Sequence, residues 1–199
     1  RKHIKIEPLR WYYHCDRLGM LVWQDMVNGG SSYNASLVTY LPTVLPNLKL
    51  KDRHYRLLAR QDKVGREEFL KECKETIEHL YNHPSIVAYT IFNEGWGQFN
   101  SDEMYDYVKE LDTTRLADST SGWFAQKKND FDSEHIYFKV IPLEPKERPL
   151  FVSECGGYTM AVEDHYYSKY AQYGYGASET KEALTKDIVY MYENMIIPF

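Results

Sequence analysis

Residues 86–97 read IVAYTIFNEGWG, and this stretch is the most informative part of the sequence about the fold. The run 86–92 is apolar almost throughout and rich in β-branched residues, a pattern typical of a strand buried on both faces of a parallel sheet. It ends abruptly in Asn93 and Glu94, and two glycines flank Trp96. The sequence therefore predicts a strand whose carboxyl end delivers a carboxylic acid into a cleft, with an aromatic wall beside it.

A second apolar run with the same kind of ending lies further along the chain. Residues 149–153 read PLFVS and lead into Glu154, which is followed by Cys155 and two glycines. Because the carboxyl ends of parallel strands share one edge of a sheet, Glu94 and Glu154 are expected to face one site. Such a pair of carboxylates is the minimum needed to cleave a glycosidic bond.

Helical and strand-like segments alternate along the whole chain, which favours an α/β fold with a parallel sheet. Helical patterns cover residues 8–18, 66–82, 101–111 and 179–195, with a helical turn at 36–41 and Ser101 as an expected N-cap. Further strands are expected over residues 20–23, 115–119, 135–138 and 150–152.

Five of the expected strands end in polar residues: Gln24 and Asp25, Asn93 and Glu94, Asp118 and Ser119, His135 with Tyr137, and Glu154. In a (β/α)₈ barrel that end of the strands is the active face. A doubly wound sheet also binds ligands at strand ends, but mainly at its switch point. Polar residues on five strand ends favour the barrel.

Composition and charge indicate which kinds of partner and site are expected for this chain. The chain has 199 residues and a net charge of −5, with no basic cluster, so nucleic acid is not an expected partner. No apolar stretch approaches the roughly 20 residues that span a membrane. Three widely spaced cysteines argue against a disulfide framework or a zinc site, and no metal or cofactor is expected. The 18 tyrosines could line a carbohydrate cleft, although packing is the commoner reason for such rings.

Four blocks of sequence carry a family resemblance: residues 15–22, 83–99, 114–123 and 149–157. In these blocks the chain resembles the catalytic barrel of glycoside hydrolase family two, the retaining β-galactosidases, β-glucuronidases and β-mannosidases. The resemblance implies a TIM barrel that is incomplete here, with roughly strands three to seven and their helices. Residues 1–199 would then be part of the catalytic domain of a longer multidomain glycosidase that acts on an oligosaccharide or glycoside.

The resemblance also implies roles for individual residues. Glu94 would be the general acid/base and Glu154 the nucleophile. The residues expected to bind substrate lie at or near strand ends: Arg1, Asp25, Asn93, Trp96, Trp123, His135 and Tyr137. One position departs from the family pattern, because the histidine that often follows the arginine would fall on Ile4.

Several alternatives stay open at this stage. Glu94 and Glu154 could be members of structural ion pairs, Trp96 and Trp123 could pack in the core, and His135 could be a buried core histidine. A complete barrel takes about 250 residues, so the alternative functions are a truncated barrel with little activity or a barrel that binds carbohydrate without cleaving it. Open strand edges predict self-association. The sugar and the cellular compartment are not predicted.

Overall fold

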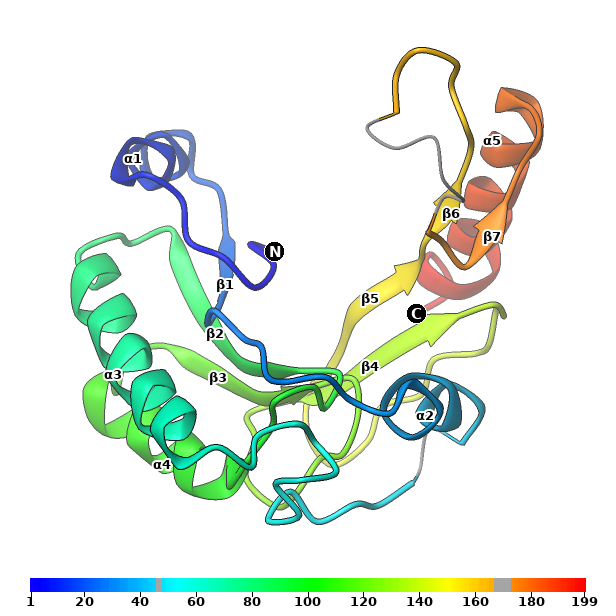
Figure 1. Ribbon diagram of the computed structural model, residues 1–199. Coiled ribbons are helices and arrows are strands. Elements are labelled where there is room, and N and C mark those ends of the chain that lie inside the picture. The colour runs from blue at the N-terminus through cyan, green and yellow to red at the C-terminus, as the bar shows by residue number, and fades with distance from the viewer. Residues whose placement is uncertain (46–47, 167–172) are drawn as a thin grey trace. The chain divides into compact units, whose positions relative to one another are not determined.

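The computed structural model describes residues 1–45, 48–166 and 173–199 (Figure 1). The chain divides into two compact units, residues 1–133 and residues 134–199, and each unit is described by itself.

The first unit is built on a parallel sheet with the order β1-β2-β3. Its strands are β1 (Val22–Asp25), β2 (Ile86–Asn93) and β3 (Leu116–Ser121). Lys2 adds a parallel bridge on the other side of β1: its N–H donates to the Trp23 carbonyl at 2.6 Å, and Asp25 N–H donates to the Lys2 carbonyl at 3.0 Å. The parallel sheet predicted from the sequence is therefore confirmed in this unit.

The helices of this unit are α1 (Leu9–Leu18), the π-helical turn η1 (Ser36–Tyr40), α2 (Leu41–Val44), α3 (Lys63–Leu80) and α4 (Ser101–Leu111). Figure 1 shows α3 and α4 side by side along the sheet. Phe69, Ile77 and Met104 belong to the same buried hydrophobic cluster as Tyr89 and Ile91. The helical patterns read from the sequence are confirmed, with boundaries shifted by up to three residues. In the described ranges, no helix combines the length and the apolar character needed to cross a membrane.

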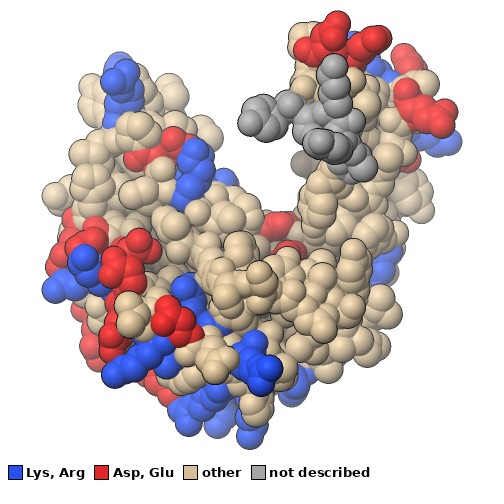
Figure 2. Space-filling view, viewed as in Figure 1, with Lys and Arg blue, Asp and Glu red and all other residues tan. Residues whose placement is uncertain are grey.

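The outer face of α3 is charged, as its helical pattern predicts. Basic and acidic side chains are interspersed there (Figure 2) and form pairs one turn apart: Lys63 with Glu67, Lys71 with Glu75, and Lys74 with Glu78. Each such exposed pair contributes only about 0.3–0.5 kcal/mol. The apolar face against the sheet is therefore the main source of stability for this helix.

The prediction that Ser101 caps α4 is wrong. The N-cap residue is Asn100, whose backbone is left-handed (φ 43°), and Ser101 is the first helical residue. The carboxylate of Asp52, from a distant loop, accepts hydrogen bonds from Ser101 N–H at 2.7 Å and from Ser101 Oγ at 2.5 Å. A tertiary contact has replaced the local cap that the sequence suggested.

The second unit contains a two-stranded sheet of β4 (Asp132–Tyr137) and β5 (Leu150–Gly156). The short strands β6 (Tyr158–Thr159) and β7 (Gly176–Ala177) pair in parallel, and α5 (Lys181–Met191) continues into the π-helical turn η2 (Tyr192–Ile196). Ile136, Met191 and Met195 form its small core. Since the strands of the described residues lie in three separate sheets, closure of a barrel stays a prediction.

The cysteines behave as the sequence predicts. All three are free thiols, and Cys15 and Cys73 are buried in the core of the first unit. Burial raises the pKa of the Cys73 thiol to about 12 and also raises the pKa of Cys155. A raised pKa keeps both thiols protonated at neutral pH, which disfavours a nucleophilic role for Cys155.

Candidate active site

A buried carboxylate organises the end of β1. Asp25 is only 1% exposed and accepts hydrogen bonds from Arg1 Nε at 2.9 Å, Arg1 Nη2 at 2.8 Å and Ile4 N–H at 3.1 Å. His3 Nδ1 lies 3.0 Å from the same carboxylate. Ile4 is held at φ 44°, an uncommon backbone angle for a β-branched residue. In this strained conformation, the Ile4 N–H donates to the Asp25 carboxylate.

Opposing effects set the charge of Asp25. Burial alone raises the pKa of its carboxyl group, but the hydrogen bonds from His3 and Arg1, together with the positive charge of Arg1, bring the pKa below its ordinary value. Asp25 is therefore ionised at neutral pH and acts as an anchor for its neighbours. His3 was not identified from the sequence, although the Ile4 departure directed attention to this segment.

Arg1 links this anchor to the end of β2. Its Nη2 donates to the Asn93 side-chain oxygen at 2.9 Å as well as to Asp25. Because the amide oxygen of Asn93 accepts from Arg1, its amide nitrogen is the group that can donate to a ligand oxygen. Three residues predicted for the site, Arg1, Asp25 and Asn93, are thus brought together.

Replacing Asp25 by Asn should destabilise the fold by about 3 kcal/mol, since it breaks a buried ion pair and leaves Arg1 uncompensated. Because the pKa of Asp25 is lowered on folding, its contribution is fully present above the unfolded value of about 3.9 and is lost as the pH falls through the folded value. Urea unfolding should show a constant difference between the two proteins above about pH 4 that shrinks at lower pH. A difference that does not change with pH would contradict this role.

The backbone around Glu94 is strained and held on several sides. Glu94 follows β2 in the left-handed region (φ 52°), and its N–H donates to the Ser121 carbonyl at the end of β3 at 3.0 Å. Three residues further on, Gly97 N–H donates to the Leu58 carbonyl at 2.7 Å and Arg60 Nε donates to the Gly97 carbonyl at 3.1 Å. Strained residues that the surrounding structure holds in place cluster at functional sites. Arg60 and Leu58 were not identified from the sequence.

The close approach of two loops requires glycine at position 97. A Cβ atom there would lie 2.0 Å from the Gly29 carbonyl oxygen, and the residue also has φ 72°. The glycine that follows Trp96 in the sequence is therefore explained by backbone packing beside the candidate acid.

Gly97→Ala should cost about 3 kcal/mol or more, because the left-handed penalty and a backbone clash add together. Gly19→Ala is the matched control: its φ is 66° and nothing lies within 4 Å of the added Cβ, so about 1 kcal/mol is expected. Urea unfolding of the two variants measures both losses. Equal losses would show that the two loops can separate without cost.

The two tryptophans predicted to bind substrate lie in different environments. Trp96 is half-buried, and its Nε1 donates to the Ser31 carbonyl at 3.1 Å while its ring lies 5.7 Å from that of Tyr33. Trp123 is only 3% exposed, which favours the packing alternative for that residue.

In the second unit, Glu154 is held by a tyrosine and accompanied by a histidine. Tyr137 Oη donates to Glu154 Oε2 at 2.5 Å, the length of a charge-assisted hydrogen bond, and lies 3.4 Å from His135 Nδ1. His135 Nε2 lies 3.7 Å from Glu154 Oε1, and the Glu154 side chain is 27% exposed. Three more predicted residues, His135, Tyr137 and Glu154, are thus brought together.

Tyr175 packs beside Tyr137 in the same unit. Its ring stacks on that of Tyr137 with centroids 3.8 Å apart and planes 11° apart, and its N–H donates to the Gly157 carbonyl at 2.9 Å. A Cβ at Gly157 would lie 2.5 Å from the Tyr175 ring. For the tyrosines of the chain in general, the sequence favoured packing over a role in a cleft. The glycines after Glu154 were the available signal that a side chain approaches there.

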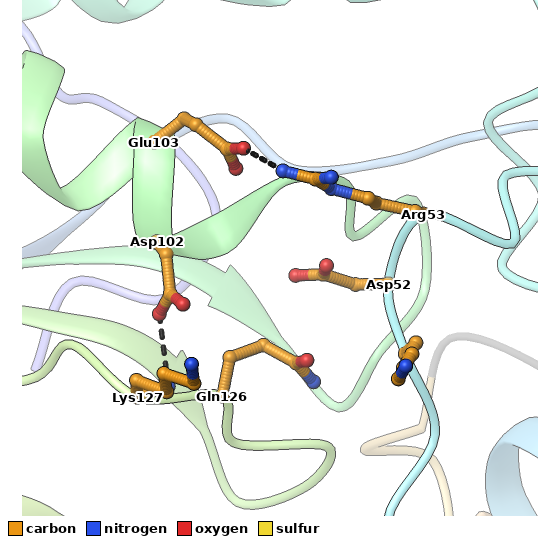
Figure 3. A pocket seen from close by; sticks show the side chains of 7 residues that line it. Asp52, Arg53, Asp102, Glu103, Gln126 and Lys127 are labelled. Carbon is orange, nitrogen blue, oxygen red and sulfur yellow. Dashed lines mark hydrogen bonds and ion pairs between the residues drawn. The ribbon is translucent and has the colours of Figure 1, made fainter.

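A polar pocket of about 310 Å³ lies beside the start of α4 (Figure 3). It is lined by Lys51, Asp52, Arg53, Asp102, Glu103, Gln126 and Lys127. Its charges are largely used within the protein: Arg53 pairs with Glu103, and the Asp102 carboxylate accepts from Lys127 N–H at 2.9 Å. None of the predicted site residues lines this pocket, so it is not part of the candidate site.

Parallel strands that alternate with helices and carry acids at their carboxyl ends define an α/β protein of the type that binds ligands at that edge. The family described as "Glycosyl hydrolases family 2, TIM barrel domain" matches residues 7–188. Since this match covers most of the chain, the chain belongs to glycosyl hydrolase family 2, within its TIM-barrel domain, and the resemblance read from the sequence is confirmed.

Individual proteins similar to this chain carry glycosidase names. The chain is 27% identical over 136 residues to a β-mannosidase B of Thermothelomyces thermophilus, covering 68% of this chain and 12% of that protein. It is 28% identical over 126 residues to a β-galactosidase of Priestia megaterium, covering 63% and 11%. A crystal structure of Parabacteroides merdae β-glucuronidase is similar with a TM-score of 0.35 and 17% identity, covering 63% of this chain and 14% of that one. The chain thus spans about a tenth of the length of the curated relatives it matches.

Proposed function

We propose that the protein containing this chain is a retaining β-glycosidase that releases a terminal sugar from a β-linked saccharide or glycoside. The observation that carries the proposal is that, in a chain of glycosyl hydrolase family 2, a glutamate stands at the carboxyl end of each of two strands. Glu154 accepts a hydrogen bond from Tyr137, and Glu94 follows Asn93 on a loop held in a strained conformation.

The mechanism gives the two acids different tasks. The ionised Glu154 attacks the anomeric carbon while Glu94 donates its proton to the departing oxygen, which forms a covalent glycosyl-enzyme. Once Glu154 is esterified, Glu94 accepts a proton from water, and the water displaces Glu154 with net retention. This mechanism requires the two carboxyl groups to lie about 5–5.5 Å apart.

The neighbouring residues support these steps. The Tyr137 hydroxyl holds Oε2 of Glu154, and His135 Nε2 lies 3.7 Å from Oε1, so both neighbours orient the carboxylate. Asn93, fixed through its oxygen by Arg1, would donate to the sugar 2-hydroxyl, whose hydrogen bond strengthens in the transition state. Asp25 is 1% exposed and would act on the substrate through the residues that it holds, Arg1 and His3.

Hydrolysis of a panel of aryl β-glycosides by the full-length protein tests the proposal. The panel should include mannosides and galactosides, because these sugars are named by similar proteins. It should also include glucuronides, because the family resemblance includes β-glucuronidases. We expect turnover of at least one member, with a first-formed product of β configuration by NMR. A product of inverted configuration would contradict retention, and binding without turnover would favour the carbohydrate-binding barrel.

We also propose that residues 1–199, taken alone, self-associate. The support is a group of exposed apolar side chains at the end of α1 and before β1: Leu18, Met20 and Leu21. Exposed apolar patches and open strand edges favour association. Sedimentation velocity should show species larger than a monomer, and the replacement of Leu18 and Leu21 by Ser should reduce them. A strictly monomeric profile of the unchanged chain would contradict this proposal.

A further inference from the structure

A large aromatic side chain is exposed and strained just after β4. Phe138 is 67% exposed and has φ 61°, in the left-handed region. A bulky residue rarely takes that conformation, because its Cβ approaches the backbone too closely. Neither the exposure nor the strain of Phe138 is accounted for by the small core of this unit, which is formed by Ile136, Met191 and Met195.

Phe138 belongs to a continuous run of rings. Its ring meets the edge of Tyr175 with centroids 5.1 Å apart and planes 85° apart, and the Tyr173 ring lies 5.7 Å from Tyr175. The hydroxyl groups of Tyr173 and Tyr175 are 2.9 Å apart, and Tyr173 is 78% exposed. Tyr175 in turn stacks on Tyr137. We call Phe138, Tyr173 and Tyr175 the aromatic platform.

The aromatic platform connects directly to the candidate nucleophile. Tyr137, on which Tyr175 stacks, donates its hydroxyl hydrogen to Glu154. The run of rings therefore extends outward from the carboxylate to two exposed rings. Exposed aromatic patches that continue a polar site mark ligand-binding surfaces. The faces of aromatic rings carry partial negative charge and suit the C–H groups on the apolar face of a pyranose.

We propose that the aromatic platform binds the leaving-group sugar of a β-linked saccharide, which makes Phe138 and Tyr173 determinants of substrate choice. This inference rests on the proposed function. An exo-acting glycosidase holds one terminal sugar at the nucleophile, and the rest of the substrate, beyond the cleaved bond, is the leaving group. Rings that run from Glu154 to the protein surface then meet the leaving-group sugar. The strain at Phe138 is retained because it presents the ring to that sugar.

The test compares two substrates with the same terminal sugar in the full-length protein: a β-linked disaccharide and the β-glycosyl fluoride, which has no leaving-group sugar. Phe138→Gly and Tyr173→Ala should each lower kcat/KM for the disaccharide about tenfold, as expected for one lost aromatic contact. Hydrolysis of the fluoride should be unchanged. Phe138→Gly should not lower the melting temperature, since glycine accepts the left-handed conformation. Tyr190→Ala, which removes another exposed aromatic side chain of the same unit, is the control and should change neither rate.

Equal losses of kcat/KM on both substrates, or no loss on the disaccharide, would overturn the proposed role of the aromatic platform. Calorimetric titration of the disaccharide and the monosaccharide into the Glu154→Gln variant, with and without Phe138→Gly, decides the same question without turnover. We expect Phe138→Gly to weaken binding of the disaccharide alone, and unchanged affinity would overturn the inference. If the wild-type protein hydrolyses neither substrate, the proposed function fails, while this binding comparison still tests the platform.

Discussion

Glu154→Gln should reduce kcat by about 10⁴-fold or more on every glycoside that the full-length protein hydrolyses, because it removes the nucleophile and closes the covalent route. Glutamine is nearly isosteric and can keep a hydrogen bond to Tyr137, so the fold should be unaffected. Steady-state kinetics on the best aryl glycoside measures the effect, with thermal unfolding as a check on the fold.

Controls can separate chemistry from structure in this experiment. Glu134→Gln changes another acid of the same unit, one that pairs with Lys146, and should leave kcat within about twofold. Glu154→Ala opens space for a small anion, so azide should restore turnover and give a glycosyl azide of inverted configuration. Turnover of Glu154→Gln near the wild-type rate would show that another group is the nucleophile.

The effect of Glu94→Ala should depend on the leaving group. A sugar or alkyl leaving group needs a proton, and loss of the acid should slow its departure by about 10²–10⁴-fold. A dinitrophenol leaves without that help, so its departure should slow much less, and breakdown of the glycosyl-enzyme should become rate-limiting. The measurement is a plot of log kcat/KM against leaving-group pKa, which should be steep for the variant and shallow for the wild type.

The matched control for that series is Glu103→Ala, which removes an acid on α4 that pairs with Arg53 outside the proposed site. It should leave the leaving-group dependence of the wild type unchanged. An equal loss across all leaving groups in Glu94→Ala would contradict the acid role and would instead indicate a structural one.

Local patterns in the sequence predicted the longer elements of the fold but not the short strands β6 and β7. The unbroken apolar run 86–92 predicts β2, and the spacing of apolar residues predicts α3 and α4, because each pattern reflects burial of that one segment. The end of β2 is also visible, because the buried apolar run changes to Asn93 and Glu94 there. Asp118 and Ser119 lie inside β3 and Glu154 inside β5, so these two strands extend beyond the ends expected from the sequence. Glu94 and Glu154 were identified on that basis and through the family resemblance.

Contacts between distant segments could not be predicted in the same way. Asp52 caps α4 across 49 positions of sequence, and Arg60 holds Gly97 across 37. The stacking of Tyr175 on Tyr137 also joins two residues that are far apart in the sequence. In each case several residues could have supplied the contact, and only the folded chain selects one of them.

The most direct test of the proposed mechanism is to trap the glycosyl-enzyme. A 2-deoxy-2-fluoro glycoside with a good leaving group forms the covalent intermediate but slows its breakdown, since fluorine destabilises the cationic transition state. Peptide mapping by mass spectrometry after incubation with the full-length protein should find one added fluorosugar, attached to Glu154, and no adduct in Glu154→Gln. An adduct on a different residue, or turnover of the natural glycoside with inverted configuration and no adduct, would contradict the assignment of Glu154 as the nucleophile.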